Sequence, residues 1–212
     1  MKLADYKDTH PGERVFILAS GPSLNRIPTE LVERLGKEQT FIISSVLRWE
    51  GLSFVPSFYL GQEIQYWAYW DTRLNEMGGA TVRFHADRFL PSVPDPWILC
   101  KVGNHDLEQG WFFGIDDRLN DLAGRTGSAA LLAAQVAVYL GFAELYLLGC
   151  DATDTGYAFQ ADAQREPGSA AQFILCTEIA HQLLQPHGIS LIDLTEGGQL
   201  TIPKGCLTDV LN

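Results

Sequence analysis

The sequence predicts an α/β protein in which helices cover both faces of a mostly parallel sheet. Two short apolar runs, at 15–19 and 145–148, have the composition of strands that are buried on both faces. Each run leads into a turn of small or acidic residues that contains a glycine, Gly21 or Gly149. Ligands of open parallel sheets bind beyond the carboxyl ends of the strands, so both turns point to one binding site.

The first half of the chain begins as a β-α-β unit and continues to alternate strands with helices. Pro28 and Thr29, a candidate cap, open the first helix. The aromatic residues within 66–70 cover more than one face of the second helix, so we expect some in the core and some at a pocket. The predicted elements are strands at 15–19, 40–44, 54–60 and 80–84 and helices at 28–35 and 62–77.

The segment at 88–124 interrupts this regular order. Prolines punctuate it, and its aromatic residues follow neither a helical nor a strand periodicity. Such a segment is typical of a lid or binding loop on a regular scaffold. We therefore predict an irregular, aromatic-rich excursion or lid here. Its prolines are Pro91, Pro94 and Pro96, and its aromatic residues include Trp97, Trp111, Phe112 and Phe113.

The regular pattern returns at residue 126 and predicts a single Rossmann-like domain over 1–212. A helix of small residues stops at Leu140-Gly141, because glycine commonly follows the last helical turn. We expect a three-layer α/β/α arrangement, with the tail at 198–212 either closing the sheet or reaching a partner subunit in a homo-oligomer. The predicted elements are helices at 126–139 and 169–184 and strands at 144–148 and 189–194, with a loop to 167 before the long helix.

The composition is that of a soluble, enzyme-sized domain. The 212 residues, 46% of them hydrophobic, can bury the core of one domain. The formal net charge of −11 makes nucleic acid an unlikely ligand, because an acidic surface repels phosphate backbones. The apolar stretch at 128–140 is too short to cross a bilayer, and residues 1–14 lack the apolar centre of a signal peptide. We expect a cytoplasmic location and no transmembrane segment.

The cysteines indicate a reducing environment. Cys100, Cys150, Cys176 and Cys206 lie far apart and form no CxxC pair. This spacing fits neither a zinc site nor a dense disulfide scaffold. We therefore expect reduced thiols, most of them buried.

The turn at Gly21, Pro22 and Ser23 has residue types that suit a phosphate or a ribose. Glycine lets the backbone approach a ligand, proline fixes φ, and serine offers a hydroxyl and an N–H. The same residues also make an ordinary turn at the end of a strand. Asp151 could likewise hold a ribose hydroxyl or a divalent metal, or it could cap a turn in the following loop.

A second small-residue turn, Thr126-Gly127-Ser128, opens the Ala-rich helix. The N–H groups at a helix N-terminus attract anions, although small residues also permit tight packing of a helix on a sheet. The turns at Gly21 and at Gly149 both follow strands, and together they favour a nucleotide site more strongly than either does alone.

Several motifs resemble those of one superfamily and occur in the same order over most of the chain. They are Ser-Gly-Pro-Ser-Leu at 20–24, Thr-Gly at 126–127, Leu-Gly-Phe at 140–142, Leu-Tyr-Leu-Leu-Gly-Cys-Asp at 145–151 and Tyr-Ala-Phe at 157–159. The chain resembles the group of 6-hydroxymethylpterin diphosphokinase MptE-like proteins, motility-associated factor glycosyltransferases and bacterial sialyltransferases that use CMP-sialic acid. Order and spacing indicate the superfamily without choosing among its members.

This resemblance implies a Rossmann-like domain that binds a nucleotide at the first Gly-Pro-Ser turn. In the sialyltransferases of the group, asparagines stand where this chain has Ser20 and Ser45, and serine reaches less far than an amide. The resemblance places Gly149 and Asp151 near the base or the ribose. It places Tyr157 toward the phosphate.

The catalytic base is the main departure from those sialyltransferases. Their base is a histidine between the Tyr-Ala-Phe motif and the next helix, whereas 160–170 contains no histidine here. A tyrosine that follows their Gly-x-Asp motif is Thr153 in this chain. His105, beside Asp106 in the aromatic-rich segment, is our first candidate for a base, and an exposed loop histidine is the alternative.

Residues 103–106 also resemble the Gly-Asn-His-Asp signature of binuclear metallophosphoesterases, and Asp8-Thr9-His10 resembles their Asp-x-His. Binuclear sites need a nearly complete ligand set. Here the Asp-x-His precedes the first predicted strand, and the bridging Gly-Asp-x-x-Asp is missing. We therefore disfavour this activity.

The preferred function is a transferase, a glycosyltransferase that uses a nucleotide-activated, CMP-type sugar and an acceptor hydroxyl. The alternative is an MptE-like diphosphokinase that transfers diphosphate from ATP to a hydroxymethyl group with Mg²⁺ held by carboxylates such as Asp151 or Glu63. A nucleotide-binding module without catalysis is the third possibility. The expected catalytic residues are His105 and Tyr157, and the expected nucleotide-binding residues are Ser20, Gly21, Pro22, Ser23, Ser45, Thr126, Gly127, Gly149 and Asp151.

Overall fold

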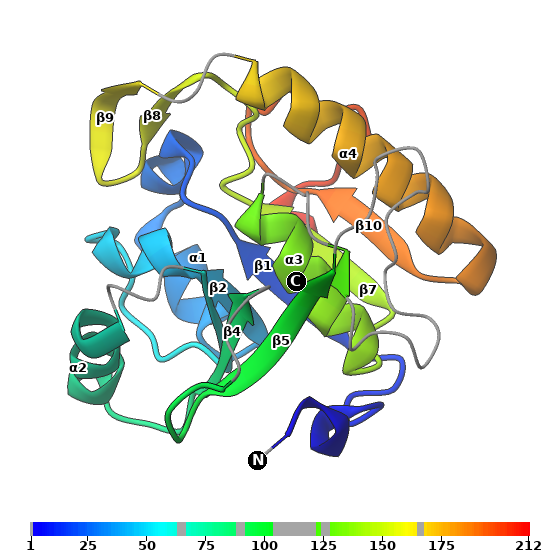
Figure 1. Ribbon diagram of the computed structural model, residues 1–212. Coiled ribbons are helices and arrows are strands. Elements are labelled where there is room, and N and C mark those ends of the chain that lie inside the picture. Colours follow the sequence, from blue (N-terminus) through cyan, green and yellow to red (C-terminus); the bar gives the residue numbers. More distant parts are fainter. Residues whose placement is uncertain (1, 63–66, 88–91, 104–121, 124–127, 165–167) are drawn as a thin grey trace.

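The computed structural model describes residues 2–62, 67–87, 92–103, 122–123, 128–164 and 168–212. Figure 1 shows a twisted central sheet with helices packed around it. The sheet has eight strands in the order β10-β7-β1-β2-β3-β4-β5-β6, and all neighbouring strands are parallel. These strands are β1 (Arg14–Leu18), β2 (Thr40–Ile43), β3 (Phe58–Gly61), β4 (Val82–Asp87), β5 (Ile98–Gly103), β6 (Leu122–Ala123), β7 (Glu144–Leu148) and β10 (Ser190–Asp193).

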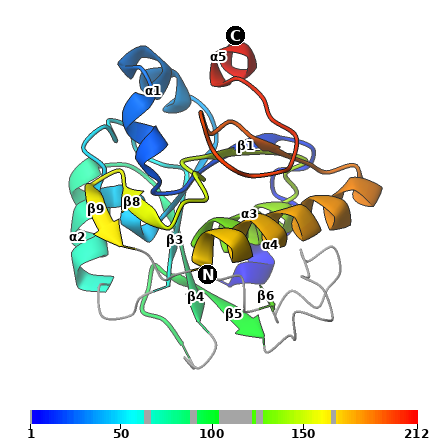
Figure 2. The ribbon, with the colours of Figure 1, turned by 90° about the horizontal axis from the view of Figure 1, so that it is seen from above.

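Helices cover both faces of this sheet. The helix α3 packs on β1, β2 and β3, and α4 lies against β10. On the opposite side, α1 and α5 contact each other (Figure 2). This arrangement confirms the predicted α/β fold class. The helices are α1 (Thr29–Leu35), α2 (Trp67–Met77), α3 (Ala129–Tyr139), α4 (Ser169–Leu184) and α5 (Leu207–Leu211), with 3-10 turns η1 (Leu3–Tyr6), η2 (Pro22–Arg26), η3 (Ser44–Arg48) and η7 (Gln185–His187).

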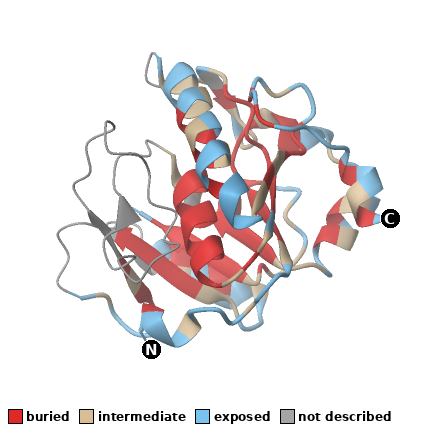
Figure 3. Ribbon diagram, turned by 90° about the vertical axis from the view of Figure 1, so that its right-hand side faces the viewer, coloured by how far each residue is buried: buried red, intermediate tan, exposed pale blue. Residues whose placement is uncertain are grey.

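The helix α3 is the most deeply buried of the helices. Every residue from Ala130 to Tyr139 is buried, including the polar Gln135. Alanines make up much of this helix, and their small side chains let its backbone approach the sheet closely. Figure 3 shows that burial is concentrated in the centre of the molecule, whereas the outer turns and loops are exposed.

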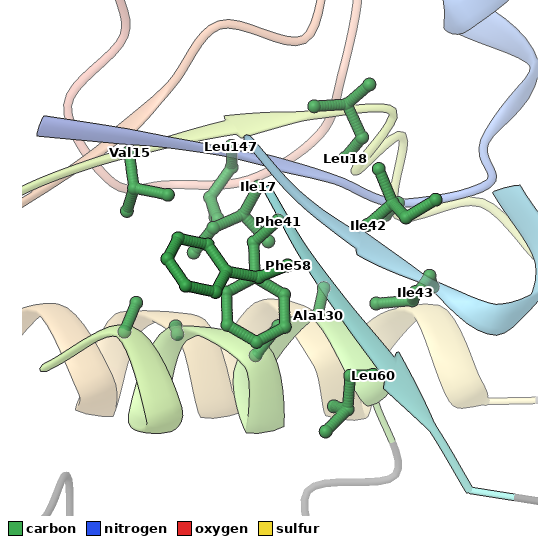
Figure 4. Close-up of a cluster of buried hydrophobic side chains, with 14 of the residues drawn as sticks. Val15, Ile17, Leu18, Phe41, Ile42, Ile43, Phe58, Leu60, Ala130 and Leu147 are labelled. Atoms are coloured by element: carbon green, nitrogen blue, oxygen red, sulfur yellow. The ribbon is translucent and has the colours of Figure 1, made fainter. Parts of the chain in front are cut away.

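The core is built on a row of side chains in register across four strands. Leu147, Ile17, Phe41 and Phe58 are consecutive partners across β7, β1, β2 and β3. Figure 4 shows these side chains on the face that covers α3, near Ala130. The rings of Phe41 and Phe58 are stacked with centroids 5.4 Å apart. Alternation along each strand puts the next residues on the opposite face, which is why both faces of the sheet are apolar.

Two strands arise within the segment that the sequence analysis describes as an irregular excursion. Strands β5 and β6 extend the parallel sheet beyond β4. Prolines precede the apolar run of β5, so the sequence pattern there is that of a loop. In the structure, parallel pairing with β4 supplies the backbone hydrogen bonds of β5. The rest of that segment, at 88–91, 104–121 and 124, lies outside the described residues.

A hairpin occupies part of the loop that was predicted to run to residue 167. Its strands are β8 (Thr155–Tyr157) and β9 (Gln160–Gln164), paired antiparallel with Tyr157 opposite Gln160. These strands are too short to give a clear alternation of apolar and polar residues in the sequence. The hairpin lies outside the main sheet (Figure 1).

The C-terminal tail closes the edge of the sheet beside β10, which is one of the two roles expected for it. The N–H of Asp193 donates to the carbonyl of Pro203 at 2.8 Å, and the N–H of Gly205 donates to the carbonyl of Asp193 at 3.0 Å. Lys204 Nζ lies 3.5 Å from the buried Asp193 carboxylate. The tail thus satisfies groups that an edge strand would otherwise expose.

The cysteines agree with the expectation of reduced thiols. All four are free, with Cys100, Cys150 and Cys176 buried and Cys206 exposed. Burial raises the pKa of Cys100 and of Cys176, because a thiolate is poorly solvated in an apolar environment. Among the described residues, no helix has the length and apolar character needed to span a membrane.

We predict that Phe41→Ala lowers the free energy of unfolding by about 3–5 kcal/mol, because it empties the centre of the row of side chains on α3. Urea denaturation measures this change. The control is Tyr69→Ala, since Tyr69 is 52% exposed and its loss is expected to cost about 1 kcal/mol or less. Equal effects of the two substitutions would contradict the proposed core.

Candidate functional site

The loops that follow β1 and β7 touch through their backbones. The N–H of Ala19 donates to the carbonyl of Leu148 at 2.7 Å, and the N–H of Gly21 donates to the carbonyl of Gly149 at 2.8 Å. A Cβ atom on Gly21 would lie 2.4 Å from the Gly149 carbonyl oxygen. A Cβ atom on Gly149 would lie 2.3 Å from the Ala19 carbonyl oxygen, and Gly149 has a φ of +68°. Both positions therefore require glycine.

Asp151 and Ser23 fasten the same two loops through their side chains. The Ser23 hydroxyl donates to Asp151 Oδ2 at 2.6 Å, and the Ser23 N–H donates to Oδ1 at 3.1 Å. Both residues are buried. The carboxylate therefore caps η2 from across the sheet edge, and hydrogen bonds to a charged acceptor are stronger than those between neutral groups.

The β8–β9 hairpin is anchored to the β1 loop and to η2. The N–H of Ala158 donates to the carbonyl of Ser20 at 2.9 Å. The Asn25 amide nitrogen donates to the carbonyl of Ala158 at 2.8 Å, while Trp49 Nε1 donates to the Asn25 amide oxygen at 2.9 Å. These bonds hold the hairpin over the carboxyl ends of the strands.

A cavity of about 540 Å³ lies between the hairpin and the carboxyl ends of β1, β2 and β7. The predicted residues that line it are Ser20, Ser45, Gly149, Asp151 and Tyr157. Its position is that of ligand sites in open parallel sheets. Its other lining residues are Ala19, Ile43, Arg48, Gln62, Trp70, Ser128, Ala129, Cys150, Ala152, Phe159, Gln160, Ser169, Ala170 and Phe173.

The cavity wall joins aromatic and polar groups. Tyr157 and Phe159 project from the hairpin with stacked rings 5.2 Å apart. The Arg48 guanidinium carbon lies 5.3 Å from the Phe159 ring centroid and 5.5 Å from that of Trp70. Trp70 is thus one member of the aromatic helix that faces the pocket, whereas Tyr69 is exposed.

Two helices begin at this cavity. The Ser128 side chain makes no capping hydrogen bond at the N-terminus of α3, where Ser128 and Ala129 line the wall. At the N-terminus of α4, the N–H of Ala170 donates to Asp154 Oδ1 at 3.0 Å. The partial positive charge of α3 is therefore directed at the cavity, while Asp154 offsets that of α4.

The first Gly-Pro-Ser turn holds the β7 loop through the hydrogen bonds between Ser23 and Asp151. Gly21, Pro22 and Ser23 do not line the cavity, and Asp151 occupies both donors of Ser23. Ser23 and Gly149 instead line a separate cavity of about 390 Å³ beside α1 and the C-terminal tail. The turn therefore fixes the position of the β7 loop.

Several predicted residues are not part of this description. His105, Thr126, Gly127 and Glu63 lie outside the described residues. The lining residues that sequence reasoning missed include Arg48 and Gln62 as polar groups. Gln62 directly follows β3 and could have been found by the rule that polar side chains at strand ends serve ligands. Arg48 carries no comparable signal.

The described residues do not assemble a metal centre. Among them, no group of three or more His, Cys, Asp and Glu residues could hold a metal ion. His10 of the Asp-x-His motif stacks on Phe142 with ring centroids 4.7 Å apart, and the N–H of Asp8 donates to the carbonyl of Tyr139. Both residues lie before β1, away from the cavity at its carboxyl end.

The fold is similar to those of known glycosyltransferases. No family model and no curated protein matches the sequence. The MAf glycosyltransferase from Magnetospirillum magneticum AMB-1 has a TM-score of 0.60 and 16% identity over 95% of this chain and 35% of that one. This chain thus spans about a third of that protein.

Two sialyltransferase structures are also similar in fold. The sialyltransferase CST-II, in complex with a trisaccharide acceptor and CMP, has a TM-score of 0.55 and 17% identity over 88% of this chain and 82% of that one. The sialyltransferase CstII from Campylobacter jejuni, in complex with the substrate analogue cytidine-5'-monophosphate, has a TM-score of 0.56 and 15% identity over 89% of this chain and 82% of that one. At these identities the likeness establishes a shared fold.

We predict that Gly149→Ala lowers the free energy of unfolding by more than about 2 kcal/mol, because it adds a steric clash to an unfavourable φ. Gly188→Ala is the matched control, since Gly188 has a φ of +71° and open space around it. This control is expected to cost about 1 kcal/mol. Urea denaturation compares the two, and equal losses would show that the approach of the loops is not constrained.

Proposed function

We propose that this chain is a glycosyltransferase that moves a sugar from a nucleotide-activated, CMP-type donor to an acceptor hydroxyl. The observation that carries this proposal is the cavity at the carboxyl ends of β1, β2 and β7, walled by an aromatic hairpin. Its volume of about 540 Å³ suits a small ligand of nucleotide size. The likeness in fold to glycosyltransferases, two of them structures with CMP, supports the same activity.

The donor nucleotide would lie along the β1, β2 and β7 loops. Ser20 and Ser45 offer hydroxyls that can donate to and accept from a ribose or phosphate. Gly149 permits close approach of the backbone, and the N-terminus of α3 attracts negative charge. Asp151 would face the base or ribose, while its bonds with Ser23 keep the loop in place. We keep Gly21, Pro22 and Ser23 as proposed nucleotide-binding residues.

The leaving phosphate is assigned to Tyr157. This residue lies on the wall of the cavity, on a hairpin that is fixed to the β1 loop through Ala158. A phenol can donate a hydrogen bond to phosphate oxygens, and that bond strengthens as the sugar–phosphate bond breaks and charge develops. We keep His105 as the proposed base that activates the acceptor hydroxyl and Thr126 and Gly127 as proposed nucleotide contacts.

The diphosphokinase alternative receives less support. It requires Mg²⁺ between the protein and the ATP phosphates. Among the described residues no carboxylate cluster is available for this ion, and the Asp151 oxygens accept hydrogen bonds from Ser23. A binding module without turnover is the remaining alternative, and it would bind the nucleotide in the same way. We propose small-molecule donors and acceptors as the partners and the cytoplasm as the compartment.

We predict that CMP raises the melting temperature in the presence of EDTA, because a ligand that binds only the folded state stabilises it. At a hundredfold excess over Kd the gain is about 2.7 kcal/mol, or roughly 5–10 °C for a domain of this size. UDP, GDP, ADP and ATP, each with and without Mg²⁺, are the comparison panel. Stabilisation by Mg-ATP alone would favour the diphosphokinase, and no response to any nucleotide would contradict both proposals.

We predict that Tyr157→Phe lowers kcat for sugar transfer from a CMP-sugar by about 10- to 100-fold, because it removes a donor to the departing phosphate. The effect on the Kd of CMP should be smaller, since the charge on the phosphate grows in the transition state. Tyr69→Phe removes an exposed phenol on α2 and is expected to leave kcat unchanged. An unchanged kcat in Tyr157→Phe would remove this role from Tyr157.

A further inference from the structure

Arg48 occupies an unusual position in the wall of the cavity. It is the last residue of η3, the turn that follows β2, and its side chain is exposed. Its guanidinium carbon lies over the ring of Trp70 from α2 and over the ring of Phe159 from the hairpin. Trp70 is buried and Phe159 stacks on Tyr157, so both rings have fixed surroundings.

The hydrogen-bond donors of Arg48 are unused within the part of the chain that the structure describes. A guanidinium carries five N–H donors. None of those on Arg48 has a hydrogen bond or ion pair with a described residue. Each of the other described arginines forms a hydrogen bond or an ion pair with a side-chain oxygen. Those residues are Arg14 with Glu38, Arg26 with Glu196, Arg34 with Asn212, Arg73 with Glu76 and Arg83 with Asp71.

The two aromatic rings orient the guanidinium without satisfying these donors. Cation–π attraction acts on the faces of the guanidinium plane, and the N–H groups point outward from its edges. An arginine whose donors are free of protein partners can present a planar fork that matches the two oxygens of a carboxylate or a phosphate. Long side chains lose rotamer entropy when they are ordered, and this stacking supplies part of that ordering before a ligand arrives.

The charge of the cavity points to an anion as the ligand of this fork. Among the described lining residues, Arg48 is the only Arg or Lys, and Asp151 is the only carboxylate. The Asp151 oxygens accept hydrogen bonds from Ser23, whereas the Arg48 guanidinium has no carboxylate partner among the described residues, and the N-terminus of α3 adds partial positive charge. In a protein with a net charge of −11, the cavity thus holds a cation that an anionic ligand can pair with.

We propose that Arg48 binds an anionic group of the donor, either its phosphate or a carboxylate on the sugar being transferred. This inference rests on the proposed function and adds the substrate class: a donor whose anion is held by an arginine within cation–π distance of Trp70 and Phe159. Arg48 is then a binding residue that selects charged donors over uncharged ones.

The test measures ligand binding by isothermal titration calorimetry for the wild type, Arg48→Gln and Arg48→Lys. The probes are CMP, cytidine and CMP-sialic acid. Arg48→Gln is expected to weaken binding of CMP about tenfold and to leave cytidine unchanged, because only CMP carries the anion. Arg48→Lys should recover part of the loss, since lysine keeps the charge but lacks the fork.

The matched control is Arg73→Gln, which removes one positive charge from an exposed ion pair on α2 outside the cavity. It should leave all three affinities unchanged. A loss confined to CMP-sialic acid would identify the sugar carboxylate as the anion, whereas a loss already seen with CMP would identify the phosphate.

Two results would overturn the role of Arg48. One is an equal loss for cytidine and CMP, which indicates a structural role for the stacked side chain. The other is an unchanged affinity for both CMP and CMP-sialic acid in Arg48→Gln. If the wild type binds neither CMP nor cytidine, the proposed function fails. Inorganic pyrophosphate then tests Arg48 by itself through the melting temperature. A rise for the wild type that Arg48→Gln abolishes supports an anion site, and no rise for the wild type rejects it.

Discussion

The site depends on the direct contact between the backbones of the β1 and β7 loops. This contact exists because Gly21 and Gly149 have no Cβ, and a hydrogen bond between them joins two segments far apart in sequence. Once the loops are this close, Asp151 reaches Ser23, and the carboxylate accepts from the N–H and the hydroxyl of this residue in η2. A buried carboxylate is costly without hydrogen-bond partners. The close approach of the loops supplies those partners from Ser23, which explains why Asp151 and the two glycines occur at one edge of the sheet.

The same contact sets the position of the cavity wall. The Ser20 carbonyl lies in the β1 loop and accepts from Ala158, so the hairpin is placed relative to the crossing of the loops. The hairpin carries Phe159 to Arg48, and Arg48 also meets Trp70. A change in the contact between the β1 and β7 loops would therefore also displace Phe159 and Arg48 in the cavity wall. The strands fix the positions of the loops, and a few hydrogen bonds between the loops and the hairpin fix the positions of the residues in the cavity wall.

The sequence predicts the elements that have a strong local signal and misses those that depend on distant partners. The bounds of β7 and α4 agree with the apolar run and the helical segment expected for them. Strand β5 is missed because prolines precede its apolar run, and the hairpin is missed because its strands are too short for a clear alternation. In the site, the glycines and Asp151 mark strand ends, but the pairing of Asp151 with Ser23 spans 128 positions. A contact between residues so far apart leaves no periodic pattern in the sequence. No sequence pattern distinguishes Arg48 from an ordinary surface arginine either.

The contrast between total and local charge explains how an acidic chain can serve an anionic ligand. Net charge acts on approaching molecules over distances of up to about 10 Å, because salt screens it beyond that distance. Within the cavity, the α3 N-terminus, one guanidinium and the Asp151 carboxylate act at contact distance, and the carboxylate oxygens accept hydrogen bonds from Ser23. A surface with a charge of −11 would then disfavour polyanions such as nucleic acids while a small anion still binds. The charge of the whole surface would thus act against large polyanions, whereas the groups in the cavity would act on small anions.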